Sequence, residues 1–199
     1  MLLNALSPFE FIARSRASDQ PPMPIEEFSI PKDRVAIAIG EKGSTKKHVE
    51  EGTKTKVVID SKNGDVEVNG EDAVKVLTAS NIIRAIGRGF SPEHALKLLD
   101  DEYYFELVHL PEIVGKNWKA LQSKRGRVIG KEGRIREQIE KDTQTFISVY
   151  GKTIGVIGKA DQVAKAVEAI HMLLGGAQHQ TVLNYLRQSL DAAEEFEFR

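Results

Sequence analysis

The 199-residue chain contains no cysteine, a single tryptophan and few aromatic residues of any kind, 7% of the total. The absence of cysteine excludes disulfide bonds, thiolate catalysis and cysteine-ligated zinc, and it fits a cytoplasmic protein. No stretch approaches the roughly eighteen apolar residues that a membrane-spanning helix needs. The apolar residues 1–6 lack the basic segment that begins a signal peptide. We therefore expect a cytoplasmic protein.

The chain also lacks an excess of charge of one sign. It has 28 basic and 29 acidic residues and a formal net charge of -1. A protein with this balance does not bind polyanions through its overall charge, so an anion site must come from an uneven distribution of charge. The hydrophobic fraction of 41% is ordinary for a globular protein, and the length suffices for two small domains.

A Gly-x-x-Gly pattern occurs twice, with similar residues around each copy. Gly130 and Gly133 lie 90 positions after Gly40 and Gly43. In both copies apolar residues precede the glycines, and a polar segment with helical spacing and then β-branched residues follow. Beyond residue 64 the offset falls to 88, where a shorter turn replaces the turn of the first copy. Such a shortening is tolerated in a surface turn, so an internal duplication is the firmest conclusion from the sequence.

Each copy is predicted to contain the same order of strands and helices. In the first copy we expect a helix after the loop that is N-capped by Ser44 or Thr45. The other segments predicted there are strands at 28–30, 56–60 and 65–69 and helices at 34–39, 71–86 and 91–101. The segments predicted in the second copy are strands at 103–110, 145–149 and 153–157 and helices at 111–122, 134–142, 160–174 and 181–193.

A Gly-x-x-Gly loop between helices lets another chain approach without meeting a Cβ atom. Free N–H groups at the start of the next helix favour a phosphate. This arrangement resembles the KH domain, whose loop holds about four nucleotides of single-stranded RNA. The resemblance implies an α+β fold of two tandem type I KH domains (β-α-α-β-β-α), each a three-stranded sheet packed on helices. The boundaries expected are 1–27 for a tail, 28–101 and 102–185 for the KH domains, and 186–199 for an acidic end.

Three segments resemble one particular group of KH-domain proteins. Residues 126–133, 148–153 and 87–93 resemble archaeal relatives of the small-subunit ribosome assembly factor "partner of Nob one". The resemblance implies a non-enzymatic protein without cofactor that binds near the 3′ end of small-subunit (16S) rRNA during ribosome assembly or initiation. It also implies a PIN-domain endonuclease and the alpha subunit of translation initiation factor two as partners.

The predicted RNA-binding residues surround the two loops. The glycines allow close approach of the backbone, and the lysines and arginines meet phosphates. The predicted set is Gly40, Glu41, Lys42, Gly43, Lys46, Lys47, Arg125, Arg127, Val128, Ile129, Gly130, Lys131, Glu132, Gly133, Arg134 and Arg136. An apolar floor facing the bases is expected from Val35, Ile39, Val128, Ile129 and Ile147, although Ile147 fits the core equally well. Ser148 is a candidate for contacts with base edges.

The two grooves are predicted to differ in charge. Residues 116–136 contain eight basic side chains and one acidic side chain, a net of +7. Residues 32–56 contain seven basic and four acidic side chains, a net of +3. Because phosphate contacts dominate affinity for nucleic acids, we expect the second groove to be the stronger anchor.

Two classes of function remain open. One is an RNA-binding assembly factor, and the other is a protein-interaction scaffold whose KH folds have mostly lost contact with RNA. Salt-dependent, saturable binding to single-stranded RNA separates them. The histidines show no metal-ligand spacing, so no metal site is expected. For Trp118 and Tyr103–Tyr104, packing in the core or between domains is favoured over stacking on bases.

Overall fold

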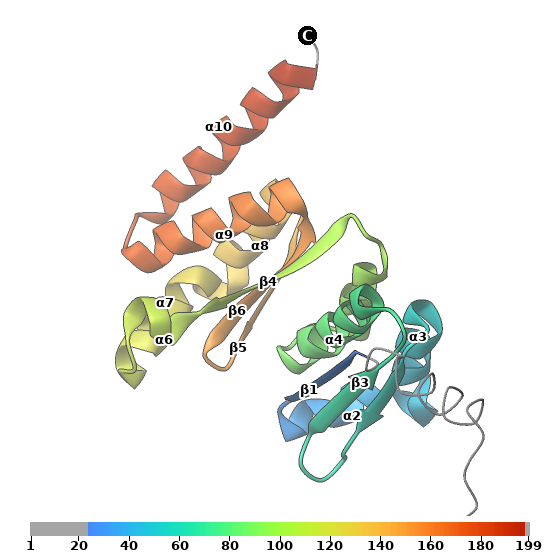
Figure 1. Ribbon diagram of the computed structural model, residues 1–199. Helices are drawn as coiled ribbons and strands as arrows, with labels where there is room; N and C mark the ends of the chain where they lie inside the picture. Colours follow the sequence, from blue (N-terminus) through green and yellow to red (C-terminus); the bar gives the residue numbers. More distant parts are fainter. Residues whose placement is uncertain (1–23, 198–199) are drawn as a thin grey trace, which may run out of the picture.

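The structure is a computed structural model that describes residues 24–197, with side chains as far as residue 188. Most of the predicted tail, residues 1–23, and the side chains of residues 189–199 in the predicted acidic end lie outside the described residues. Two modules follow one another along the chain, and each has a three-stranded antiparallel sheet. Figure 1 shows the first module in blue and green and the second in yellow to red.

The first module has the predicted order of elements. They are β1 (Ile25–Ser29), α2 (Lys32–Ile39), the short helix η1 (Glu41–Gly43), α3 (Ser44–Thr53), β2 (Lys56–Ile59), β3 (Asp65–Asn69) and α4 (Ala73–Gly87). The sheet has the order β1-β3-β2. The first strand was predicted three residues too late, because the alternation in β1 uses polar Glu26 as an inward residue. Its carboxylate pairs with Arg84 of α4 at 2.5 Å, and a glutamate paired in this way gives no apolar signal.

A joint, residues 88–102, ends the first module and leads to the second module. Their elements are α5 (Pro92–Ala95), η2 (Leu96–Leu99), β4 (Tyr103–His109), α6 (Leu110–Val114), α7 (Trp118–Ile129), η3 (Lys131–Gly133), α8 (Arg134–Thr143), β5 (Phe146–Tyr150), β6 (Thr153–Lys159), α9 (Ala160–Gly175) and α10 (His179–Glu197). The single helix predicted at 111–122 is wrong. Gly115, with φ of 80°, ends α6, and the Asn117 side chain caps a new helix by accepting hydrogen bonds from two N–H groups.

The duplication is visible in matching side-chain contacts. The Thr53 hydroxyl bonds the Val49 carbonyl at 2.7 Å and lies 2.7 Å from the Thr55 hydroxyl. In the second module Thr143 makes the same pair of contacts, at 2.7 Å to the Ile139 carbonyl and 2.8 Å to Thr145. These contacts fix the turn between the helix after the loop and the edge strand, so the repeated threonines have a structural cause.

The sheet of the second module packs on the first module with one of its faces. Its central strand, β6, is buried on both faces: Ile157 belongs to the core of the first module, whereas Val156 belongs to that of the second. A Cβ on Gly155 would lie 2.7 Å from the Phe90 ring, so the joint packs closely on the sheet. Buried side chains of this size contribute about 1.5–3 kcal/mol each. The apolar contact therefore holds the modules as one unit.

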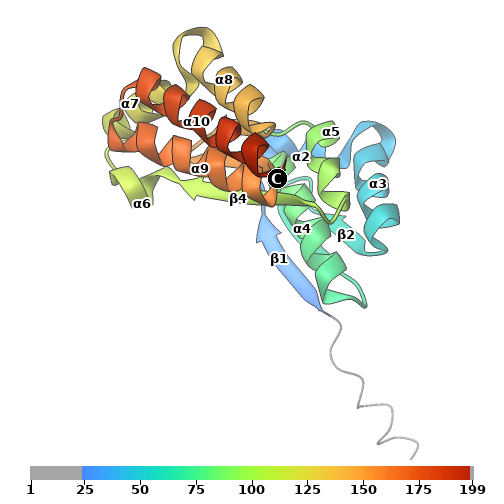
Figure 2. The same cartoon turned by 90° about the horizontal axis from the view of Figure 1, so that it is seen from above.

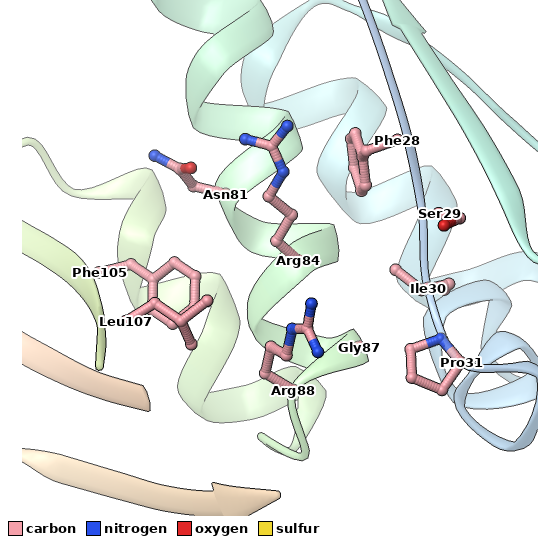
Figure 3. Close-up of a pocket in the computed structure, with 10 residues that line it drawn as sticks. All are labelled: Phe28, Ser29, Ile30, Pro31, Asn81, Arg84, Gly87, Arg88, Phe105 and Leu107. Atoms are coloured by element: carbon pink, nitrogen blue, oxygen red, sulfur yellow. The ribbon is translucent and has the colours of Figure 1, made fainter. Parts of the chain in front are cut away.

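A cleft of about 360 Å³ opens between the modules. It lies beside β1 and β4, which are edge strands of the two sheets. Figure 3 shows Asn81 and Arg84 on α4 and Arg88 just after its end, between Phe28 of β1 and Phe105 of β4. The Arg84 guanidinium lies 4.4 Å from the centre of the Phe28 ring. On the far side of the second module, α10 packs across α8 and α9, as Figure 2 shows.

Candidate nucleic-acid interface

The two Gly-x-x-Gly loops have almost the same backbone. Gly40 has φ of 78° and ψ of 172°, and Gly130 has φ of 74° and ψ of 179°. The residue before the second glycine is left-handed in both loops, with φ of 51° at Lys42 and 55° at Glu132. Left-handed backbone at a residue other than glycine is uncommon and clusters at functional sites. The same unusual loop has therefore been kept in both modules.

The two glycines of each loop have different tasks. A Cβ on Gly130 would lie 2.4 Å from Ile135 Cγ1, and a Cβ on Gly40 would lie 2.4 Å from Thr45 Oγ1. A Cβ on Gly43 would meet nothing within 4 Å, and on Gly133 it would meet only Glu137, at 3.4 Å. The first glycine is thus needed for the loop to close on its own helix. The second faces open space, where another chain can approach.

No side chain caps the helix that follows either loop. The N-cap residues of α3 and α8 are Gly43 and Gly133, so the prediction that Ser44 or Thr45 caps α3 is wrong. Ser44 and Thr45 are the first two residues of α3 itself, and from there their side chains do not reach back to the free N–H groups. The first-turn amides therefore have no side-chain acceptor, and together with the helix dipole they favour a phosphate.

The polar residues between the glycines appear in opposite order in the two loops. The first loop has Glu41 before Lys42, and the second has Lys131 before Glu132. Arg134 follows the second loop and lies 3.2 Å from Glu132, with 74% of its side chain exposed. Each loop therefore presents a basic side chain to solvent, but from a different position.

A glutamate on the helix after each loop holds the neighbouring edge strand. Glu50 accepts a hydrogen bond from the backbone N–H of Val57 at 2.9 Å, and Glu140 accepts one from Ile147 at 2.7 Å. Lys46 and Arg136 lie near these carboxylates, at 3.8 and 3.5 Å. These glutamates are 90 positions apart, so the repeat itself carried the signal for them, although the sequence prediction omitted both.

One predicted RNA-binding side chain, Arg127, is occupied within the fold, as is its neighbour Lys124. Arg127 donates hydrogen bonds to the carbonyls of Leu173 and Ala177, and Lys124 donates to that of Leu174. Both cations thus cap the carboxyl end of α9, where the helix dipole favours positive charge. Arg125 is half-buried, and its Nε has no hydrogen-bond partner among the described residues. The exposed cations at the loops are Lys42, Lys47, Lys131 and Arg134.

The expected apolar floor is largely part of the core. Val35, Val128 and Ile147 are buried at 5% exposure or less, and they pack in the cores of their modules. Ile39 and Ile129 are half-buried and remain available at the groove. The Ser148 hydroxyl donates a hydrogen bond to the Arg88 carbonyl of the joint at 2.8 Å, so its proton is engaged by the first module.

The charge difference depends on the window of residues compared. Residues 122–146, which correspond to 32–56 at the offset of 90, contain seven basic and four acidic side chains. Their net charge of +3 equals that of the first module. The larger value for 116–136 leaves out Glu137 and Glu140, which lie 3.8 and 3.5 Å from the Arg136 guanidinium. Any difference between the grooves therefore rests on where the cations lie.

A hydrogen bond between the modules is sensitive to high pH. The Tyr150 hydroxyl donates to the Asp33 carboxylate at 2.6 Å, and this bond raises the pKa of Tyr150 above its ordinary value of 10.0. Because the folded pKa is the higher one, the stabilisation is complete below about pH 10 and is lost as the pH rises through the folded value.

We expect Tyr150→Phe to reduce the loss of thermal stability between pH 9 and pH 11, measured by melting followed with circular dichroism. Asp33→Ala should have the same effect, and the double variant should add nothing to either single one, because all three remove the same hydrogen bond. Equal pH dependence in Asp33→Ala and the unchanged protein would contradict this assignment.

Two aromatic side chains do not follow the prediction of burial. Trp118 is 56% exposed at the start of α7, and Tyr104 is 53% exposed on β4. Tyr103 does pack against the core of the first module. Within residues 24–197, no group of acidic and histidine side chains could hold a metal ion. The same residues contain no helix long and apolar enough to cross a membrane.

Comparison with known families agrees with this geometry. A KH-domain family model matches residues 25–85, and the model of the second KH domain of PNO1, a eukaryotic-type (type I) KH domain, matches residues 104–190. The protein is therefore a tandem KH-domain protein. It belongs to the family that includes the pre-rRNA-processing protein PNO1 and archaeal Dim2p.

The similarity extends over most of the chain in archaeal relatives. A KH domain-containing protein of Methanocaldococcus jannaschii is 43% identical over 82% of this chain and 73% of its own length. The crystal structure of Dim2p from Pyrococcus horikoshii has 44% identity and a TM-score of 0.77, covering 83% of this chain and 99% of that one. PNO1 of Chaetomium thermophilum is 31% identical over 54% of this chain, which spans 42% of the PNO1 length.

Proposed function

We propose that this protein is a non-enzymatic RNA-binding factor of small-subunit ribosome assembly that holds the 3′-end region of 16S rRNA. The observation that carries the proposal is the pair of uncapped, left-handed Gly-x-x-Gly loops, each with an outward glycine and an exposed cation. This geometry suits the sugar–phosphate backbone of about four unpaired nucleotides per groove.

The family supports the ribosomal context. The PNO1 relatives are pre-rRNA-processing proteins, and a chain with 44% identity and a TM-score of 0.78 is the Pyrococcus horikoshii Dim2p in a complex with a/eIF2alpha and rRNA. That complex supports rRNA and the alpha subunit of initiation factor two as partners of this protein. A PIN-domain endonuclease as a further partner rests on the family resemblance, and the cytoplasm as the location rests on the absence of cysteine.

Binding to a 3′-terminal fragment of 16S rRNA should be saturable and should weaken as salt increases. Each phosphate that a cation neutralises adds about 0.7 to the slope of log K against log salt for a single strand. With three or four such contacts we expect a slope of about -2 to -3, measured by fluorescence anisotropy. A single-stranded DNA of the same sequence serves as the control for 2′-hydroxyl recognition.

The alternative function is a scaffold that contacts proteins and hardly touches RNA. It predicts no saturable binding and a flat response to salt in the same titration. Either result would reject RNA binding as the main activity. One surface favours this alternative. On the first sheet, Glu27, Asp65 and Glu67 line an acidic hollow together with the exposed Val58. Such a surface repels RNA and suits a basic protein partner.

A further inference from the structure

A second cavity between the modules lies along the edge strand β5, beside the second loop. It has a volume of about 470 Å³, which is within the range of sites that hold small ligands. The second module provides Arg136 and Glu140 of α8 and the strand residues 147–150. The opposite wall belongs to the first module, which provides Arg34, Ser91 and His94. The groove of the second module is thus bordered by its neighbour.

The wall from the first module is held in place firmly. Arg34 donates hydrogen bonds to the carbonyls of Ile86 at 2.8 Å and Phe90 at 2.5 Å. The ring of His94 stacks on Phe146 with 4.1 Å between centroids and an angle of 24°. With the Ser148 bond to the Arg88 carbonyl, these contacts keep the wall at a fixed place beside the strand. A preformed wall needs little ordering when a ligand binds.

The cavity retains unused donors. The Ser91 oxygen accepts from the His94 N–H at 3.3 Å, which leaves the hydroxyl proton free to donate. The Arg136 side chain is 37% exposed and lines the cavity as a cation, paired with Glu140 at 3.5 Å. No hydrogen bond to the His94 ring nitrogens is found among residues 24–188. A cation, a hydroxyl and an aromatic ring in one cavity are suited to a phosphate, a sugar and a base.

We propose that this cavity is a subsite for one further nucleotide of the RNA strand held by the second loop. Arg136 is three residues beyond Gly133, one helical turn, so the cavity begins where the loop ends. Ser91 and His94 would then contact a nucleotide outside the four held by a single KH groove. The first module would serve as part of the second groove. This inference rests on the proposed RNA binding.

The test compares RNAs of different length on variants of the full chain. Ser91→Asp places a carboxylate in the cavity and keeps a good N-cap for α5, so the fold should be unaffected. The RNAs are nested oligonucleotides of about four to eight residues from the 3′ end of 16S rRNA, extended at either end. For the unchanged protein, adding the nucleotide that reaches the subsite should raise affinity about tenfold. For Ser91→Asp this gain should disappear, whereas binding of the tetranucleotide should change less than about twofold.

Asn81→Asp is the matched control. It adds the same charge to the first module, but it faces the opposite cleft shown in Figure 3. Equal losses in the two variants would show a general electrostatic effect and overturn the subsite. His94→Ala should also remove the gain in affinity that lengthening the RNA gives. The melting temperature of this variant is measured in parallel as a check on its fold. An unchanged gain in both Ser91→Asp and His94→Ala would overturn the proposal. A failure of the unchanged protein to bind any of the RNAs would instead reject the proposed function.

Discussion

Replacing Lys131 and Arg134 with glutamine should lower affinity for single-stranded RNA on the order of 10- to 100-fold at 0.1 M salt. Both side chains are exposed beside the uncapped start of α8. Among residues 24–188 the Arg134 guanidinium pairs with Glu132 alone, at 3.2 Å, and this surface pair contributes little to stability. The change therefore removes two phosphate contacts and leaves the fold intact. The slope of log K against log salt should become shallower by about 1.4.

The first loop offers a matched control. Lys42→Gln with Lys47→Gln also removes two exposed charges, at a groove with the same net charge over equivalent residues. We expect this variant to lose less than about threefold in affinity, because a second module that has a cavity beside its loop is the stronger clamp. A larger loss in the first loop than in the second would reverse the assignment of the main groove.

Much of the fold could be predicted because the duplication supplied each element twice. The residues at offsets of 90 and 88 occupy equivalent places, and the paired threonines and glutamates show why. The prediction of a single helix at 111–122 was wrong for a local reason. Gly115 adopts a left-handed conformation that the apolar spacing around it did not indicate, and Asn117 then restarts the helix.

Only part of the candidate site could be predicted from the sequence. The loops, their glycines and the surrounding cations follow from residue types and spacing. The engagement of Arg127 with the end of α9 does not, because the contact joins residues 46 and 50 positions apart. By contrast, the pairing of Arg136 with Glu140 was readable from the sequence, because the two residues lie four positions apart on a predicted helix. Contacts across the fold, such as those of Arg127, decide which of the other cations are free.

The joint was the largest omission. Residues 87–93 were noted for their resemblance to the family, but nothing in their pattern places Ser91 and His94 beside a strand about sixty residues later. The one local signal was Ser91 before Pro92, which correctly predicted a helix start. The function of this segment depends on how the modules pack, which the spacing of residues within one module cannot reveal.

The two glycines of the second loop should respond differently to the same substitution. Gly130→Ala and Gly133→Ala both place an alanine at φ near 80°, since the native angles are 74° and 82°. The strain is larger at Gly130, whose ψ of 179° lies in a region that is essentially restricted to glycine. At Gly133 the ψ of -1° lies near the left-handed helical region, where an alanine costs about 1–2 kcal/mol. Gly130→Ala adds a contact of 2.4 Å with Ile135, which packs against the core of the second module. Its total loss of stability should reach about 3–5 kcal/mol, measured by urea unfolding.

Gly133→Ala should instead separate folding from binding. Its new methyl group meets no atom closer than 3.4 Å, so the loss of stability should stay near the strain alone, about 1–2 kcal/mol. The methyl group projects into the space where the RNA backbone approaches, so affinity should fall about tenfold or more in a protein that remains folded. Similar losses of stability in both variants would show that the loop relaxes around Ile135. Normal RNA affinity in Gly133→Ala would show that the outward glycine does not face the RNA, and the clamp would have to be placed elsewhere on the second module.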